Sequence, residues 1–309
     1  MEQAEITFAI PFYGSVDYLR LTLDSVRAQT VDTWRALVVD DLSPTEDARY
    51  LVASFADPRI TYVRNNENLG LGGNWNRCVE LSDTSLITLL HGDDELMPHY
   101  AEQMLTAHQR WPDAAAVFCP ADIIDARGVP MFSFRDHVKR WLLPKANQPF
   151  VLEGEAGVRS LLLGNFIMCP TLCYKKTLFN DLRFSPEWRM VLDVDFYLRA
   201  LMRGHRLVGL VERGYRYRRH EGQVTTESER NLRIFTEEIA LWRRSAADAR
   251  HQGWPAAARV ADKMRIIKLQ LSYYILGDLL KLQFGPAKGK LQLLGRLLRG
   301  DSREAGNDD

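Results

Sequence analysis

Short apolar runs and helix-like segments alternate through the first hundred residues. Four mainly apolar runs predict strands at residues 6–10, 36–39, 60–63 and 85–90. The first run is expected to stop at Pro11, and Asp17 is a candidate N-cap for the helix that follows. The buried face of that helix is expected to hold Leu19, Leu23 and Val26. Because strands that are apolar on both faces are typical of a parallel sheet with helices on either side, the pattern predicts an α/β fold.

The rest of the chain predicts more elements of this kind and then a purely helical end. Further strands are expected near 115–118 and 171–174, helices near 155–163, 193–203, 230–250 and 256–298, and a loop over 134–149. Gly and Pro at 253–255 and 285–286 are expected to break the last helical region.

Composition limits the classes of protein that fit. The 309 residues carry 40 basic and 40 acidic side chains, so no bulk charge favours a nucleic-acid partner. The four cysteines form no C-x-x-C pair and have no histidines near them at zinc-site spacing. No apolar run approaches the roughly 18–20 residues that span a bilayer, and the acidic N-terminus is unlike a secretory signal. We therefore expect a cytoplasmic protein that does not bind nucleic acid.

Acidic pairs follow two of the predicted strands. Asp40 and Asp41 close the second run, and Asp93 and Asp94 close the fourth. The carboxyl ends of parallel strands share one edge of the sheet, which is where ligands bind in open α/β folds. Carboxylates there suit Mg²⁺ or Mn²⁺ bound together with substrate phosphates. Taken singly, each pair also fits a solvated turn or the acidic start of a helix.

Three other motifs carry polar groups. A Gly-rich turn over 68–76 would let backbone amides approach a phosphate, although it also fits an ordinary helix start with Asn caps. Asp193 and Asp195 open an amphipathic segment, in which one carboxylate would be a general base and the other a cap, or both would be caps. Arg218 and His220 lie in a cationic segment that fits a diphosphate or metal contact, or ordinary surface.

In their order along the chain, these motifs resemble family 2 of the inverting glycosyltransferases, which have the GT-A nucleotide-sugar-binding fold. The matching segments are FAIPFY at 8–13, LDSVRAQT at 23–30, VVDDLS at 38–43, the 68–76 turn, LLHGDD at 89–94, Asp193 with FYLR at 196–199, and YRRH at 217–220. The resemblance implies a Rossmann-like, mostly parallel sheet flanked by helices. We expect a GT-A domain over 1–225, with a donor half at about 1–125 and an acceptor half at about 126–225. A helical extension over 226–300 and a disordered tail over 301–309 would follow.

The resemblance also implies roles for particular residues. Asp193 would be the catalytic base, and Asp94, Asp93 and His220 would bind Mn²⁺ or Mg²⁺. The donor, expected to be a UDP-sugar, would be held by Pro11, Tyr13, Asp40, Asp41, Asn68, Gly70, Asn74, Asn76, Asp93 and Arg218.

Two departures from the family pattern bear on this assignment. Gly14 stands where the family frequently has Asn, and the D-x-D element lacks its first Asp because it reads His91-Gly92-Asp93-Asp94. The expected reaction is metal-dependent, inverting transfer of a sugar to a hydroxyl of a saccharide or lipid-linked saccharide in envelope polysaccharide or glycan biosynthesis. The alternative, favoured by the missing Asp, is a catalytically degenerate nucleotide-sugar-binding or scaffold protein.

The last predicted helix fits more than one kind of contact. A stripe of leucines with cations beside it runs along the last predicted helix: Leu291, Leu294, Leu297 and Leu298 with Lys290, Arg296 and Arg299. The stripe fits peripheral contact with the inner face of the cytoplasmic membrane, packing on the domain, or a second subunit in a homo-oligomer.

Overall fold

The computed structural model describes residues 4–44, 48–132, 147–220 and 232–299. In this part of the chain eight strands form the central sheet, in the order β3-β2-β1-β4-β9-β6-β10-β8. Their bounds are β1 Ile6–Phe12, β2 Trp34–Asp40, β3 Ile60–Arg64, β4 Leu86–Leu89, β6 Ala114–Phe118, β8 Phe150–Leu152, β9 Leu172–Lys175 and β10 Arg206–Gly209. Strands β1 to β4 are parallel, as are β6 and β10, whereas β8 and β9 run antiparallel to their neighbours. The predicted mostly parallel α/β sheet is confirmed.

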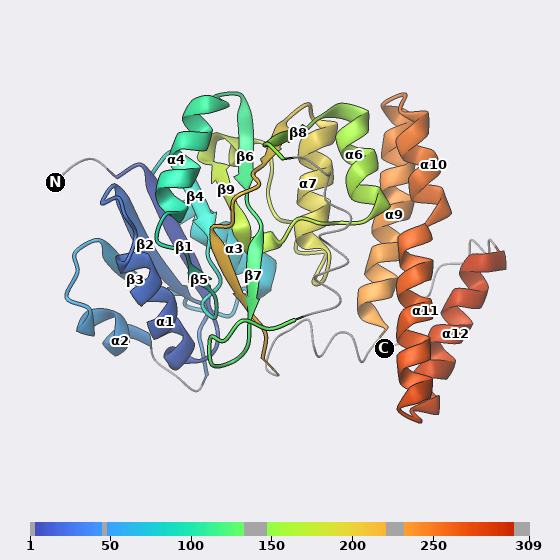
Figure 1. The fold of residues 1–309 in the computed structure, drawn as a ribbon, viewed down its shortest axis with the longest axis horizontal. Coiled ribbons are helices and arrows are strands. Elements are labelled where there is room, and N and C mark those ends of the chain that lie inside the picture. The colour runs from blue at the N-terminus through green and yellow to red at the C-terminus, as the bar shows by residue number, and fades with distance from the viewer. Residues whose placement is uncertain (1–3, 45–47, 133–146, 221–231, 300–309) are drawn as a thin grey trace.

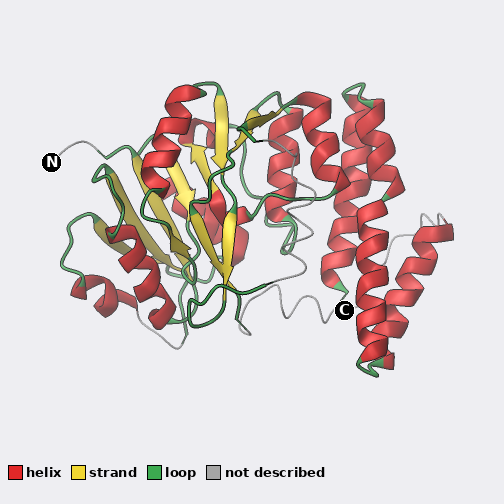
Figure 2. Cartoon of the chain, viewed as in Figure 1, coloured by secondary structure: helices red, strands yellow, loops and turns green. Residues whose placement is uncertain are grey.

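Helices cover both faces of this sheet (Figures 1 and 2). Their bounds are α1 Val16–Arg27, α2 Ala48–Ser54, α3 Gly70–Leu81, α4 Tyr100–Arg110, α6 Gly154–Leu163 and α7 Leu192–Met202, with 3-10 turns η1 Cys169–Thr171 and η2 Lys176–Asn180. Alternate residues of β1 enter different cores, because successive side chains of a strand point to opposite faces. Phe8 and Ile10 join the core that includes α1 and α4, and Ala9 joins the core that includes α3, α6 and α7.

Strand β1 continues through Pro11, so the prediction that it stops there is wrong. Pro11 lies opposite Val39 of β2. On the other side, β4 pairs with β1 only as far as Ala9, whose carbonyl accepts from the Leu90 N–H at 2.9 Å. Residue 11 faces the same side as residue 9, beyond the end of β4, so the N–H that proline lacks has no ladder partner to lose. The helix cap also differs from the prediction, because Ser15 Oγ accepts from the Asp17 N–H at 3.3 Å.

A second, three-stranded sheet has the order β5-β11-β7. Its strands are β5 Glu95–Leu96, β7 Ala121–Ile124 and β11 Tyr215–Arg218. A helix start directly after Asp94 is therefore not found: β5 follows instead, and helix α4 begins only at Tyr100. By pairing with β5, strand β11 brings residues from late in the chain beside the end of β4.

The C-terminal helices lie at one end of the long axis, away from β1, β2 and β3 (Figure 1). They are α9 Arg233–His251, α10 Pro255–Lys263, α11 Arg265–Leu280 and α12 Phe284–Arg299. The break before Pro255 is confirmed, but Gly285 and Pro286 fall within the first turn of α12, and a further break occurs at Met264, where φ is 44°. No helix among the described residues has the length and apolarity to cross a membrane. The predicted tail over 301–309 and most of the predicted 134–149 loop lie outside the described residues.

Candidate active site

Asp94 is fully buried just beyond β4 and joins three elements. Its carboxylate accepts hydrogen bonds from the Arg218 backbone N–H at 2.8 Å and from the Tyr215 hydroxyl at 3.0 Å. Its backbone carbonyl accepts from Thr22 Oγ1, on α1, at 2.7 Å. Burial, and then the charge of Asp93, raise the pKa of Asp94 well above its usual value. Asp94 therefore fastens β11 and α1 to the carboxyl end of β4.

Asp93 lies beside His220, as the sequence predicted for a shared site. The distance from His220 Nε2 to Asp93 Oδ2 is 2.9 Å. The His220 ring packs on Tyr18 of α1, with 4.8 Å between ring centroids. Unlike Asp94, the Asp93 side chain keeps 27% of its surface exposed, so it can still reach a ligand.

His91 joins the two aspartates in a cluster that the sequence analysis did not assign to metal. One potential ligand atom from each of His91, Asp93 and Asp94 lies within 4.8 Å of the others. His91 Nε2 is buried and has no hydrogen-bond partner among the described residues. Burial lowers the pKa of His91, although Asp93 opposes the shift, and the neutral imidazole is the form that binds metals. The available signal was its place in the sequence, since His91 occupies the position of the missing first Asp.

Arg218, predicted to contact the donor diphosphate, is buried within the protein. Its Nε donates to the Asp93 carbonyl at 2.8 Å, its Nη1 to the Asp125 carbonyl at 3.1 Å, and its Nη2 pairs with Glu95. The guanidinium also faces the Tyr18 ring, 5.2 Å from its centroid. These contacts make Arg218 a link between β5, β11 and the loop after β7.

The other acidic pair closes β2 and is also buried. Asp40 Oδ2 accepts from the Tyr62 hydroxyl at 2.7 Å and lies 3.7 Å from an Arg64 guanidinium nitrogen. Asp41 Oδ1 accepts from Asn65 Nδ2 at 2.9 Å and from the Leu69 N–H at 2.8 Å. Both carboxylates therefore hold the loops at the edge of the sheet in place.

The Gly-rich turn is held by its asparagines. Asn68 Nδ2 donates to the Asp41 carbonyl at 3.1 Å, and its Oδ1 accepts from the Gly70 N–H at 3.0 Å. Gly70 has a φ of +71°, a conformation that favours glycine. Asn74 donates to the Val39 carbonyl at 3.1 Å and accepts from Asn65 Nδ2 at 3.0 Å. The turn is thereby fixed against the ends of β2 and β3, near the exposed Tyr13 that follows β1.

Asn76 and Gly72 bring the predicted catalytic helix to the same place. Asn76 Nδ2 donates to the Phe184 carbonyl at 2.9 Å, and Asn76 Oδ1 accepts from the Phe184 N–H at 3.0 Å. A Cβ atom on Gly72 would lie 3.5 Å from Leu192 Cδ1, at the start of α7. The first turn of α7, which carries Asp193, therefore lies beside the first turns of α3.

Asp193 and Asp195 differ in environment. Asp195 is buried and accepts from Arg199 Nε at 2.7 Å, so its charge is neutralised within the helix. Asp193 is half-buried. The N-cap position of α7 is Val191, so neither aspartate occupies it.

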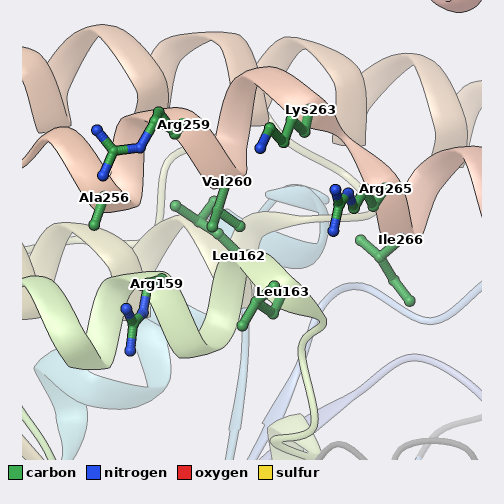
Figure 3. Close-up of a pocket in the computed structure, with 9 residues that line it drawn as sticks. All are labelled: Arg159, Leu162, Leu163, Ala256, Arg259, Val260, Lys263, Arg265 and Ile266. Carbon is green, nitrogen blue, oxygen red and sulfur yellow. The ribbon is translucent and has the colours of Figure 1, made fainter.

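A pocket of about 220 Å³ lies elsewhere, between α6, α10 and the start of α11 (Figure 3). Its lining combines apolar side chains with four cations: Arg159, Arg259, Lys263 and Arg265. None of the predicted donor, metal or catalytic residues lines it, so this pocket is separate from the acidic cluster after β4.

Comparison with known proteins gives matches in sequence and in structure. The family model described as Glycosyl transferase family 2 matches residues 7–163. The chain is 29% identical to an uncharacterized protein of Mycobacterium tuberculosis, over 72% of this chain and 69% of that protein. It is 28% identical to the succinoglycan biosynthesis protein ExoO of Rhizobium meliloti, over 72% of this chain and 62% of that protein. The crystal structure of S. aureus TarS residues 1–349 in complex with UDP-GlcNAc matches with a TM-score of 0.63 at 17% identity, over 95% of this chain and 81% of that chain.

Proposed function

We propose that this chain, which belongs to glycosyl transferase family 2, moves a sugar from a UDP-sugar to a hydroxyl of a saccharide or lipid-linked saccharide and inverts the anomeric centre. The GT-A fold and the glycosyltransferase class are shown by the family and structural matches. A UDP-sugar donor is supported by the UDP-GlcNAc complex of TarS, and a role in polysaccharide biosynthesis by the succinoglycan relative. The acceptor hydroxyl and a place at the inner face of the cytoplasmic membrane are part of the proposal.

One observation carries the proposal: His220, which follows strand β11, contacts Asp93, while the neighbouring Asp94 is hydrogen-bonded to the backbone of the same strand. In a degenerate binding protein, the acidic motif after β4 would have no reason to keep this arrangement with a residue more than a hundred positions away. The absent first Asp of the D-x-D element, which favoured the degenerate alternative, is replaced by His91 in the same cluster.

A divalent cation fits this cluster. His91, Asp93 and Asp94 would hold it, with His220 orienting Asp93. Two carboxylates and a neutral imidazole, whose Nδ1 lies 3.9 Å from Asp94 Oδ2, are suitable ligands for Mn²⁺ or Mg²⁺. When bound, such an ion neutralises negative charge on the leaving diphosphate.

The protein's own groups would divide the remaining work. Tyr13, exposed after β1, and the Gly-rich turn at 68–76 would receive the nucleotide. Asp40, Asp41, Asn74 and Arg218 would act by holding these loops, because their polar atoms already bond within the protein.

Asp193 would act as the general base. Its carboxylate takes the acceptor hydroxyl proton while the hydroxyl oxygen bonds to the anomeric carbon and the bond from that carbon to the diphosphate oxygen breaks. Attack from the side opposite the leaving group inverts the configuration. The position of α7 beside the first turns of α3 supports this role.

The test is a screen of nucleotide sugars by thermal shift and by slow donor hydrolysis, with and without Mn²⁺. We expect the melting temperature to rise with UDP or a UDP-sugar only when the metal is present, together with release of UDP. The absence of any shift with every donor, in either condition, would instead support the degenerate binding or scaffold protein.

Asp193→Asn tests the catalytic assignment in the same assay. Because general-base catalysis contributes about 10²–10⁴-fold, we expect the transfer rate to fall at least about 100-fold while the donor-induced thermal shift persists. A variant with wild-type transfer rates would exclude Asp193 as the base.

A further inference from the structure

Helix α11 has two apolar faces, and the described chain covers only one of them. On the inner face, Ile267, Leu271 and Ile275 are buried in the core shared with α9. On the opposite face four large side chains recur at helical spacing with more than half of their surface exposed: Leu269 64%, Tyr273 53%, Leu276 58% and Leu280 77%. A helix that is apolar all round is typical of a protein core or of contact with lipid.

Exposed apolar side chains continue from α11 into the turn before α12. Leu282 is 74% exposed and Phe284 is 65% exposed. Together with the four residues of α11 they form the hairpin patch: Leu269, Tyr273, Leu276, Leu280, Leu282 and Phe284. Single exposed apolar residues are ordinary, but a set of this size on one hairpin marks an interaction surface.

The hairpin that carries this patch is strongly basic. Residues 265–299 contain seven cationic side chains and one acid, Asp278. Asp278 is engaged at 2.7 Å by Lys290, which is buried between the two helices. Arg265 precedes Leu269 by one helical turn, and Arg265, Lys281 and Lys288 are exposed. The hairpin therefore offers an apolar surface next to positive charge that no acid of its own balances.

These two features together fit one class of partner. In a symmetric dimer, the same patch would meet itself and bring two basic hairpins into contact, which like charges oppose. An anionic lipid surface instead accepts the apolar side chains and attracts the cations, and stable peripheral binding needs two such signals. We propose that the α11–α12 hairpin docks on an anionic lipid bilayer through the hairpin patch.

Docking in this way leaves the candidate active site accessible. The hairpin lies at the end of the long axis opposite β1, β2 and β3, so a bound membrane does not cover the donor half (Figure 1). Cations of the pocket between α6 and α10 continue the basic surface from Arg265 to Arg259 and Lys263 (Figure 3). The inference deepens the proposed function, because it would hold the enzyme where a lipid-linked acceptor is found.

Flotation of the full chain with vesicles tests the docking. We expect the protein to float with vesicles of phosphatidylcholine and phosphatidylglycerol, and to stay at the bottom with phosphatidylcholine alone. Leu276→Gln together with Leu280→Gln should reduce the floated fraction at least tenfold. Leu21→Gln together with Tyr50→Gln is the matched control, because these side chains are 42% and 76% exposed on α1 and α2, and it should float as the wild type does.

A second arm tests the charges. We expect flotation, and its dependence on salt, to be weaker in a triple variant that combines Lys268→Gln, Lys281→Gln and Lys288→Gln. Its circular dichroism spectrum should match that of the wild type. Wild-type protein that does not float, equal flotation on both lipids, or equal flotation of the Leu276/Leu280 variant would each overturn the proposal. So would a wild-type dimer that the same variant converts to a monomer without any vesicle binding. Because no donor or acceptor is present, failure here is separate from failure of the glycosyltransferase assay.

Discussion

At the scale of single residues, two neighbouring carboxylates of the acidic motif have different surroundings. Asp94 is buried and uses its oxygens to hold Tyr215 and Arg218, whereas Asp93 is partly exposed and meets His220. The more accessible Asp93 is therefore the better placed to reach a ligand, and Asp94 keeps the cluster rigid. Rigid support of this kind is what an active site needs if its reacting groups are to stay within reach of one another.

His91 provides a direct test of the metal assignment. We expect His91→Ala to raise the Mn²⁺ concentration needed for half-maximal transferase activity by at least about 10-fold, because loss of a ligand should cost no less than the roughly 10–100-fold that follows loss of a ligand's hydrogen-bond partner. The measurement is a Mn²⁺ titration of UDP release by wild type and variant. His99→Ala is the control, because His99 is exposed and its ring nitrogen Nε2 bonds to the Arg213 carbonyl, outside the acidic cluster. An unchanged titration for His91→Ala would remove His91 from the site.

At the scale of elements, α3 connects the 68–76 turn to the segment before α7 through Asn76. The two hydrogen bonds between Asn76 and Phe184 fix the segment that leads to α7. Asn76 is among the predicted donor-binding residues, but both polar atoms of its side chain bond to the Phe184 backbone. If Asn76 acts through Phe184, its substitution should change stability more than donor affinity.

We expect Asn76→Ala to lower the free energy of unfolding by about 2 kcal/mol or more, because it leaves a backbone N–H and a carbonyl without partners. Urea denaturation measures this change. The donor concentration for half-maximal rate should change less than threefold in the folded variant. If stability is unchanged and donor affinity falls tenfold or more, Asn76 contacts the donor directly.

The strands differ in how clearly the sequence predicts them. The run at 36–39 identifies β2 because burial on both faces leaves a continuous apolar signal. Strand β5 has only two residues, and its partner β11 lies more than a hundred positions away, so no local pattern marks either one. The same reason explains part of the site: Asp93, Asp94 and His220 were predicted from motifs, but the burial of Arg218 depends on this non-local pairing.

At the scale of the whole molecule, the two ends of the long axis differ in structure. Strands β1, β2 and β3 lie at one end, and the α11–α12 hairpin lies beyond α9 at the other end (Figure 1). Trp242 of α9 joins these parts by donating to the Leu162 carbonyl of α6 at 3.1 Å. The helical extension therefore shares a core with the catalytic domain, and we expect both parts to unfold together.

The stability of this shared fold is predicted to depend on pH through His108. This residue of α4 is buried, with Nε2 3.1 Å from the Cys173 carbonyl of β9 and no partner for Nδ1 among the described residues. Burial lowers the pKa of His108 to about 4, from 6.5 in an exposed histidine. Between these values the unfolded chain binds a proton that the folded protein does not bind. The free energy of unfolding should therefore decrease as the pH falls from 6.5 towards 4, by up to about 3 kcal/mol from this group.

His108→Gln removes the titrating group and keeps a side-chain donor that can reach the Cys173 carbonyl. We expect the variant to lose less stability than the wild type between pH 6.5 and pH 4.5, with a difference in slope of up to about 1.4 kcal/mol per pH unit. Urea denaturation at pH 4.5, 5.5 and 6.5 measures both slopes, and His99→Gln, at an exposed position, should retain the wild-type dependence. Parallel curves for wild type and His108→Gln would mean that His108 binds its proton as tightly in the folded protein as in the unfolded chain. The folded protein would then have to admit a charged imidazole between α4 and β9, which requires that these two elements separate without global unfolding.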